Sequence, residues 1–178
     1  MNKKVLWITE TALMLALLIA LQYLTKGFGQ MVTGSCVNAI LAICVLVAGL
    51  GSGFTVALIS PVAAFLLGIA PQVLVVPAIM LGNTVFVALL HLIAKKSIVS
   101  RVLAWIVAAA CKFAVLYLVV AQLVCGVLAE PLLAQGLLKQ PMLQALPATF
   151  GIAQFVTALI GGAVGLLIAP TLKKALKK

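Results

Sequence analysis

Long runs of apolar residues constrain the fold of this chain more than any other feature of its sequence. Six runs are long enough to cross the hydrocarbon core of a bilayer, which is about 30 Å thick and needs about 17 to 25 helical residues. They cover approximately residues 5–24, 32–50, 54–69, 73–94, 102–128 and 146–172. The sequence therefore predicts an all-α membrane protein, a bundle of six transmembrane helices in a single domain over residues 1–178.

The composition points to the same class. Apolar residues make up 66% of the chain, charged residues make up 8%, and there is no Asp, whereas about a quarter of an ordinary soluble domain is charged. A net charge of +10 would suggest nucleic acid as the partner of a soluble chain. Here the basic residues stand at the ends of the apolar runs, so membrane lipid is the expected environment and nucleic acid is not an expected partner. No cleaved signal peptide is expected, because the first run continues to Leu24 without a small-residue cleavage site.

The basic residues also predict the orientation. Six spans put both termini on the same side of the membrane, and cytoplasmic termini place nine basic residues inside: Lys3, Lys4, Lys95, Lys96, Arg101, Lys173, Lys174, Lys177 and Lys178. Only Lys26 and Lys139 then lie outside, while Lys112 falls within the fifth span. The positive-inside rule therefore favours cytoplasmic termini.

Breaks in the apolar pattern predict how the spans are connected. Residues 51–53, Gly-Ser-Gly, are expected to be a tight inner turn, and residues 25–31 are expected to be a flexible outer loop. Residues 129–145 could form a short helix at the outer interface. Pro61 interrupts the third span and Pro71 and Pro77 stand at the start of the fourth, where exposed carbonyls need protein or a polar cavity to receive them.

Polar residues within the spans are costly in lipid and usually face the bundle. By the predicted topology they share the outer half of the membrane, and we expect them to line a substrate pocket that opens outward. The candidate substrate-binding residues are Gln30, Ser35, Asn38, Gln72, Asn83, Lys112, Tyr117 and Gln154. The first and third spans carry almost no strong hydrogen-bonding groups at this depth, so the later helices are expected to form the pocket.

Lys112 is the most informative single residue. It lies eleven residues after Arg101, about 16 Å along a helix, which is far for its side chain to reach the cytoplasmic boundary. Neither Glu is predicted near its depth, so a carboxylate partner within the chain is not expected. Either Asn83 and helix-end carbonyls hold the ammonium group, or an anionic ligand does.

The sequence offers little for catalysis. It contains two distant Glu residues and a single His, so paired carboxylates or a histidine-rich metal set cannot form, and no catalytic residue, metal or cofactor is expected. No GxxxxGK[ST] phosphate loop is present either. The cysteines show no CxxC spacing and are expected to be free thiols: Cys36, Cys44, Cys111 and Cys125.

Ala12, Ala16 and Ala20 recur every four residues in the first span and share one helix face. Such strips of small residues mark helix contacts in lipid. The strip can pack within the chain, or it can dock to another membrane subunit. Gly161 and Gly165 show the same spacing in the sixth span, where close packing of helices is the first interpretation.

These features together resemble the substrate-binding S component of an energy-coupling factor transporter. The similarity rests on the six short spans, the alanine repeat, the outer loop after it and the outward polar residues. Residues 34–83, GSCVNAILAICVLVAGLGSGFTVALISPVAAFLLGIAPQVLVVPAIMLGN, are also similar to such proteins, and the similarity extends over most of the chain.

The resemblance implies a multi-pass protein of a prokaryotic plasma membrane that captures a vitamin or related micronutrient from outside. It further implies docking through Ala12 and Ala16 to a transmembrane T subunit driven by two cytoplasmic ATPases, with no enzymatic activity in the S component itself. It does not specify the vitamin.

Two other classes stay open from the sequence. A membrane scaffold or assembly subunit would also be a polar-poor bundle with small-residue faces, and it would bind protein instead of solute. A small channel is less favoured, because a pore needs polar residues along its whole length and the inner half of this bundle is predicted to be apolar.

Overall fold

The computed structural model describes residues 2–70, 72–95 and 97–176, and these residues form helices with no strand among them. The predicted all-α class is therefore confirmed for this part of the chain. Pro71, Lys96, Lys177 and Lys178, which entered the predictions above, lie outside the described residues. The elements are α1 (Lys3–Thr25), η1 (Lys26–Phe28), α2 (Gln30–Ala48), α3 (Leu50–Leu66), η2 (Val73–Val75), α4 (Val76–Ile93), α5 (Ile98–Leu116), η3 (Tyr117–Val127), α6 (Ala129–Ala134), α7 (Met142–Phe150) and α8 (Ile152–Ala175).

Five helical segments of the described chain are long and apolar enough to cross a membrane, which makes this a multi-pass membrane protein by length and composition. They are Lys3–Phe28, Gln30–Ala48, Val73–Ile93, Ile98–Val127 and Met142–Ala175. The third predicted span is represented by α3, an apolar helix of 17 residues. At 1.5 Å per residue it is about 26 Å long, slightly less than the hydrocarbon core. A sixth crossing stays a prediction.

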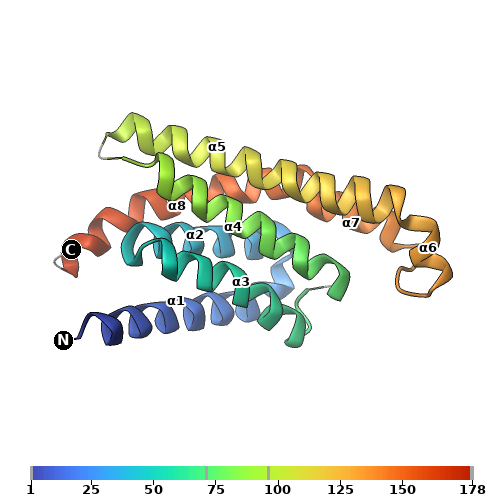
Figure 1. The fold of residues 1–178 in the computed structure, drawn as a ribbon, viewed down its shortest axis with the longest axis horizontal. Coiled ribbons are helices and arrows are strands. Elements are labelled where there is room, and N and C mark those ends of the chain that lie inside the picture. Colours follow the sequence, from blue (N-terminus) through green and yellow to red (C-terminus); the bar gives the residue numbers. More distant parts are fainter. Residues whose placement is uncertain (1, 71, 96, 177–178) are drawn as a thin grey trace.

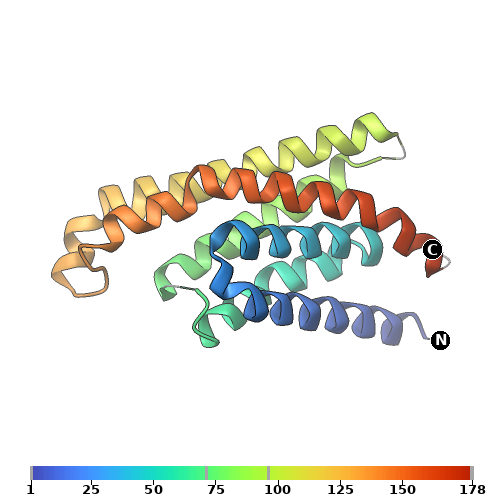
Figure 2. The same cartoon turned by 180° about the vertical axis from the view of Figure 1, so that it is seen from behind.

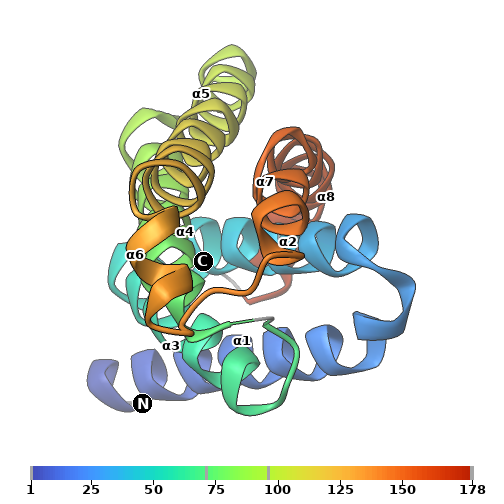
Figure 3. The ribbon, with the colours of Figure 1, turned by 90° about the vertical axis from the view of Figure 1, so that its right-hand side faces the viewer.

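The helices lie side by side, and the chain reverses at two opposite ends of the bundle (Figures 1 and 2). We call the end that holds the start of α1, the end of α8 and the α2–α3 and α4–α5 connections the terminal end. The opposite end, which holds η1, the α3–α4 connection and α6, is called the loop end. Viewed along the bundle, α1 lies at one edge beside α2 and α3 (Figure 3).

The turn between α2 and α3 differs from the prediction. Gly49, with φ +91°, makes the reversal, and α3 begins at Leu50, so Gly51, Ser52 and Gly53 are helical. The Ser52 side chain is buried and its Oγ lies 2.7 Å from Thr11 Oγ1 on α1. A Cβ at Gly53 would lie 2.6 Å from Val87 Cγ1. The predicted turn residues therefore serve helix packing instead.

The other predicted connections also contain short helices. The connection after α1, predicted as a flexible outer loop, contains the 3-10 helix η1, followed by Gly29 at φ +82° and the start of α2. Within residues 129–145 a short helix is present as α6, over the first six residues, and its position at a membrane interface stays a prediction. Pro61 lies inside α3, and Pro77 is in the first turn of α4, where a missing N–H costs little.

The core is centred on α2, which packs against α1, α3, α4 and α8. Its contact with α8 is close because Gly161 and Gly165 face it. A Cβ at Gly161 would lie 2.6 Å from Asn38 Cβ and 2.7 Å from Ala39 N, and a Cβ at Gly165 would lie 2.5 Å from Ala42 Cβ. The GxxxG spacing therefore marks helix packing within the chain, as the sequence indicates.

We expect Gly161→Ala to destabilise the protein by about 1–3 kcal/mol, because a methyl group there meets the backbone of α2, which cannot move aside cheaply. The check is the apparent melting temperature in detergent micelles. Gly51→Ala is the matched control, since its added Cβ would meet nothing closer than Trp7 Nε1 at 3.4 Å. Equal melting temperatures for the two variants would contradict the close contact between α2 and α8.

Candidate functional site

A buried ammonium group is the centre of the polar interior. Lys112 on α5 is 2% exposed, and its Nζ donates to Asn38 Oδ1 on α2 and to Asn83 Oδ1 on α4, each at 2.6 Å. A buried charge is costly unless hydrogen bonds replace its water shell. The two amide oxygens supply this replacement, so the helices α2, α4 and α5 meet at one cation.

Asn38 also links this cluster to α8. Its Nδ2 donates to Gly34 O at 2.9 Å and makes a longer contact of 3.4 Å to Thr157 Oγ1. Thr157 Oγ1 in turn donates to Gln154 O at 3.1 Å. Asn38 is 1% exposed, and both ends of its amide are engaged, which fixes its orientation.

A cavity of about 90 Å³ lies against Lys112 toward the loop end of the bundle. Residues from α1, α2, α3, α4, α5, α7 and α8 line it, together with Ile69 and Ala70 of the α3–α4 connection. Its polar lining consists of Gln22, Gln30, Thr33, Asn38, Ser60, Asn83, Lys112, Thr149 and Gln154.

Three lining side chains carry buried polar atoms that have no hydrogen-bond partner among the described residues: Gln22 Oε1, Ser60 Oγ and Asn83 Nδ2. All three side chains are more than nine-tenths buried. Each buried polar atom without a hydrogen bond lowers the stability of the fold by about 1–3 kcal/mol. Groups of this kind around a cavity indicate a place for a polar ligand.

The chemistry of the site favours an anionic or carbonyl-rich ligand. Lys112 has three N–H donors and uses two of them on the asparagines, and Asn83 has its oxygen occupied but its Nδ2 without a partner. Among the described residues that line the cavity, none is acidic. The site therefore offers positive charge and N–H donors, with Gln22 Oε1 as an acceptor and the Ser60 hydroxyl able to act as either.

The size of the cavity limits what it accepts in this conformation. Pockets for drug-sized ligands measure about 300–1,000 Å³, several times the 90 Å³ found here. A ligand of a few non-hydrogen atoms fits without change. A larger ligand requires movement of the wall, which at the loop end consists of Ile69, Ala70, Thr149 and Phe150.

The structure brings five of the eight predicted substrate-binding residues to this cavity: Gln30, Asn38, Asn83, Lys112 and Gln154. Of the two possibilities for holding Lys112, it shows Asn83 in that role, joined by Asn38. The structure therefore contains a cavity where the sequence predicts a pocket, and binding of a substrate there stays a prediction.

The other three predicted residues do not line it. Ser35 Oγ donates to Met31 O of its own helix at 2.6 Å, and the residue is half-buried. Gln72 Nε2 donates to Leu137 O at 3.2 Å and so connects the α3–α4 and α6–α7 segments. Tyr117 OH accepts from Gln122 Nε2 at 2.9 Å.

The expectation that the first and third helices stay away from the pocket is wrong. Gln22 on α1 and Ser60 on α3 both line the cavity. Gln22 lies four residues after Leu18 and eight after Met14, which are buried, so helical spacing places it on the inward face of α1. The spacing of Met14, Leu18 and Gln22 can be read from the sequence. A count of polar residues in each helix does not use it, because such a count ignores which face of the helix a residue lies on. Thr33 and Thr149, also absent from the predicted site, line the cavity as well.

The alanine strip of α1 faces away from the bundle. Ala12, Ala16 and Ala20 are exposed, whereas the opposite face of the helix buries Thr11, Met14, Leu18 and Gln22. The strip therefore does not serve packing within the described chain. Docking of another subunit to it stays a prediction.

Comparisons with family models, curated proteins and solved structures find no match for this chain. The resemblance to S components therefore stays a prediction from the sequence. The cavity and the exposed face of α1 are the observations that bear on function.

We expect Asn83→Leu to lower stability by about 2–3 kcal/mol, because it removes one of two acceptors from a buried ammonium. In a Lys112→Met background the same change should cost much less, since no cation is left to satisfy. The double-mutant cycle is measured as apparent melting temperatures in detergent. Ser35→Ala is the control and should have little effect, as its hydroxyl bonds only its own helix. Equal costs of Asn83→Leu in both backgrounds would contradict a structural coupling between the two residues.

Proposed function

We propose that this protein is the substrate-binding subunit of an energy-coupling factor importer that takes up a vitamin or a related micronutrient. The observation that carries the proposal is the cavity beside Lys112, where buried polar atoms without partners surround a cation. A purely structural polar cluster would be expected to satisfy its own hydrogen bonds. This one leaves donors and an acceptor without partners on residues that line a cavity.

The distribution of charge supports an outward-facing site. The described basic residues at the terminal end are Lys3, Lys4, Lys95, Arg101, Lys173 and Lys174, whereas Lys26 and Lys139 belong to connections at the loop end. Under the positive-inside rule the terminal end is cytoplasmic. The cavity, which is nearer the loop end, then receives its ligand from outside the cell.

The exposed alanine strip supports a role for a partner. The resemblance to S components implies that two separate ATPases hydrolyse ATP, and the sequence itself contains no phosphate loop of the GxxxxGK[ST] kind. A transmembrane T subunit couples them to the S component. The small side chains of Ala12 and Ala16 on α1 allow the backbone of such a helix to approach closely.

The chemistry of the cavity narrows the substrate class. A carboxylate or ring carbonyl of the ligand can accept from Lys112 Nζ and Asn83 Nδ2, and a separate N–H or O–H of the same ligand can donate to Gln22 Oε1. A ligand of vitamin size further requires the wall at the loop end to open. We therefore favour a small carboxylate-bearing or carbonyl-bearing micronutrient.

A membrane scaffold that binds only protein is the second candidate, because the exposed face of α1 suits a protein partner whether or not a solute is bound. The two functions differ in ligand binding. Native mass spectrometry and thermal-shift screening over vitamins, cofactor precursors and nucleobases should identify one bound small molecule if the chain is an S component. A protein partner that co-purifies without any ATPase or ligand would favour the scaffold.

We expect Asn83→Asp to abolish binding of an anionic ligand while leaving the protein folded, because the new carboxylate is nearly isosteric and pairs with Lys112. Gln135→Glu adds the same charge at an exposed position of the loop end and should leave affinity nearly unchanged. Both are measured by thermal shift or calorimetry with the ligand found in the screen. Full-affinity binding by Asn83→Asp would exclude Lys112 and Asn83 as the anion-binding pair.

Replacing both Ala12 and Ala16 with Leu should abolish uptake in cells while leaving ligand binding by the isolated protein intact. The matched control replaces Ala110 and Ala114 with Leu, since these alanines are also four residues apart and exposed, but on α5. Uptake of radiolabelled ligand and co-purification of the ATPases are the measurements. Equal losses of uptake in both double variants would argue against α1 as the docking face.

A further inference from the structure

A second hollow, unrelated to the cavity beside Lys112, lies at the terminal end of the bundle. It has a volume of about 550 Å³ and is bordered by residues of α2, α5 and α8 and by the end of α4. Its lining combines the apolar side chains Leu46, Leu166 and Pro170 with four basic residues, Lys95, Arg101, Lys173 and Lys174. The positive-inside rule explains why cations gather at this end of the molecule but not why they border one hollow.

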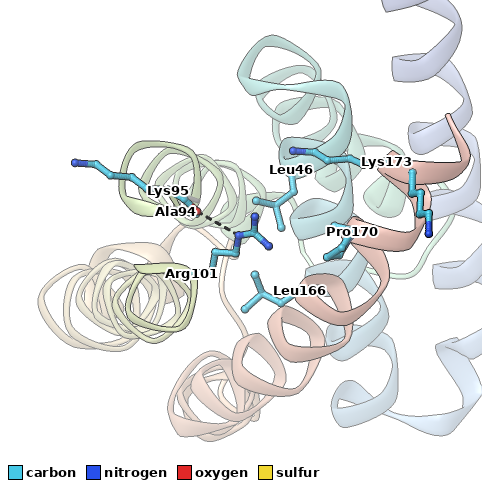
Figure 4. A pocket seen from close by; sticks show the side chains of 9 residues that line it. Leu46, Ala94, Lys95, Arg101, Leu166, Pro170 and Lys173 are labelled. Atoms are coloured by element: carbon cyan, nitrogen blue, oxygen red, sulfur yellow. Dashed lines mark hydrogen bonds between the residues drawn. The ribbon is translucent and has the colours of Figure 1, made fainter. Parts of the chain in front are cut away.

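Two of the cations are directed at the hollow from opposite sides. Figure 4 shows the guanidinium group of Arg101 on α5 and the side chain of Lys173 on α8 reaching toward each other across Leu46. The side chain of Lys95 points away from the hollow in the same view. Arg101 and Lys173 are therefore the cations placed to hold one anion between α5 and α8.

The guanidinium group is held in place by the α4–α5 connection. Arg101 Nε donates to Lys95 O at 3.2 Å. Ser100 Oγ donates to Ile93 O and accepts from Lys95 N, the latter at 3.0 Å. With Nε engaged, the terminal nitrogens of the Arg101 fork remain for an external acceptor, and this planar pair of donors suits a phosphate oxygen pair.

No acidic side chain neutralises this hollow from within the described lining. Of the two acidic residues in the chain, Glu10 lies on α1 and Glu130 on α6, and neither borders it. The wall below the cations is apolar, formed by Leu46, Leu166 and Ala169. The hollow thus combines basic side chains at the end of the bundle with an apolar wall. An anionic phospholipid has the matching arrangement, with a negative headgroup and an apolar acyl chain.

We infer that the hollow between α2, α5 and α8 binds the phosphate headgroup of an anionic phospholipid of the cytoplasmic leaflet. Arg101 and Lys173 hold the phosphate, Lys174 adds positive charge at the rim, and the first part of an acyl chain packs against Leu46 and Leu166. Basic pockets between transmembrane helices on the cytoplasmic side recognise anionic headgroups by the same combination. The assignment does not depend on the substrate-binding role proposed above.

The test compares lipids retained by the full-length protein. Wild type is reconstituted in nanodiscs with equal parts of phosphatidylglycerol and phosphatidylcholine, then extracted and examined by native mass spectrometry. We expect one phosphatidylglycerol per protein in preference to phosphatidylcholine. The double variant Lys173→Gln, Lys174→Gln should retain it about tenfold less, since each cation near an anionic headgroup contributes several-fold to binding.

The matched control is the double variant Lys3→Gln, Lys4→Gln, which removes the same charge from exposed positions at the same end but away from the hollow. Its lipid retention should change by less than about twofold. Equal losses in both double variants, or equal retention of the two lipids by wild type, would overturn the assignment.

In lipid-free detergent, millimolar inorganic phosphate should stabilise the protein far less than phosphatidylglycerol does. Equal stabilisation would identify a free-phosphate site instead, and preferential binding of a poly-glutamate peptide would indicate an acidic protein segment.

Discussion

The burial of one ammonium group constrains the rest of this structure. Among the described residues, the Nζ of Lys112 is held by the amide oxygens of Asn38 and Asn83, each at 2.6 Å. These bonds require α2, α4 and α5 to meet at one depth. They also require α8 to come close, because Asn38 reaches Thr157 and a side chain at Gly161 would collide with Asn38 Cβ. Since the oxygen of Asn83 is committed to Lys112, its Nδ2 is left for the cavity. Helix packing and the chemistry of the site thus follow from the same buried charge.

The fold class and the centre of the site could be predicted from the sequence because lipid penalises polar groups strongly. Asn38, Asn83, Lys112 and Gln154 stand out in apolar runs for that reason, and they do line one cavity. The position of the α2–α3 turn could not be predicted from the cost of polar groups in lipid. Several glycines are available between residues 49 and 53, and the reversal falls at Gly49 because Ser52 and Gly53 are used in contacts with α1 and α4. Those contacts are tertiary and leave no local signal.

The prediction of the site residues was partly wrong because it used the depth of each residue in the membrane and not the helix face on which the residue lies. Gln22 is on the inward face of α1, whereas Tyr117 lies off the buried stripe of α5 and η3. That stripe, Ala104, Ala108, Lys112, Leu116, Val120 and Val124, repeats every four residues. In an α-helix of 3.6 residues per turn it would rotate by about 40° per repeat. The π-helical hydrogen bonds of Tyr117–Val127 widen the turn, which keeps Val120 and Val124 facing the bundle. Sequence periodicity at 3.6 residues does not anticipate this change.

The two sides of the cavity differ in how strongly they are held. Its floor is formed by side chains from the middle of long helices, joined by hydrogen bonds to a cation. On the loop-end side the backbone leaves regular helix. The chain turns at Gly68 with φ +66° before η2, and α7 is separated from α8 at Gly151. Backbone with fewer intrahelical bonds and fewer buried contacts opens at lower cost than a packed helix centre. Any enlargement of the 90 Å³ cavity is therefore least costly at the loop end, which is the end where a ligand enters under the proposed function, while Lys112 stays in place.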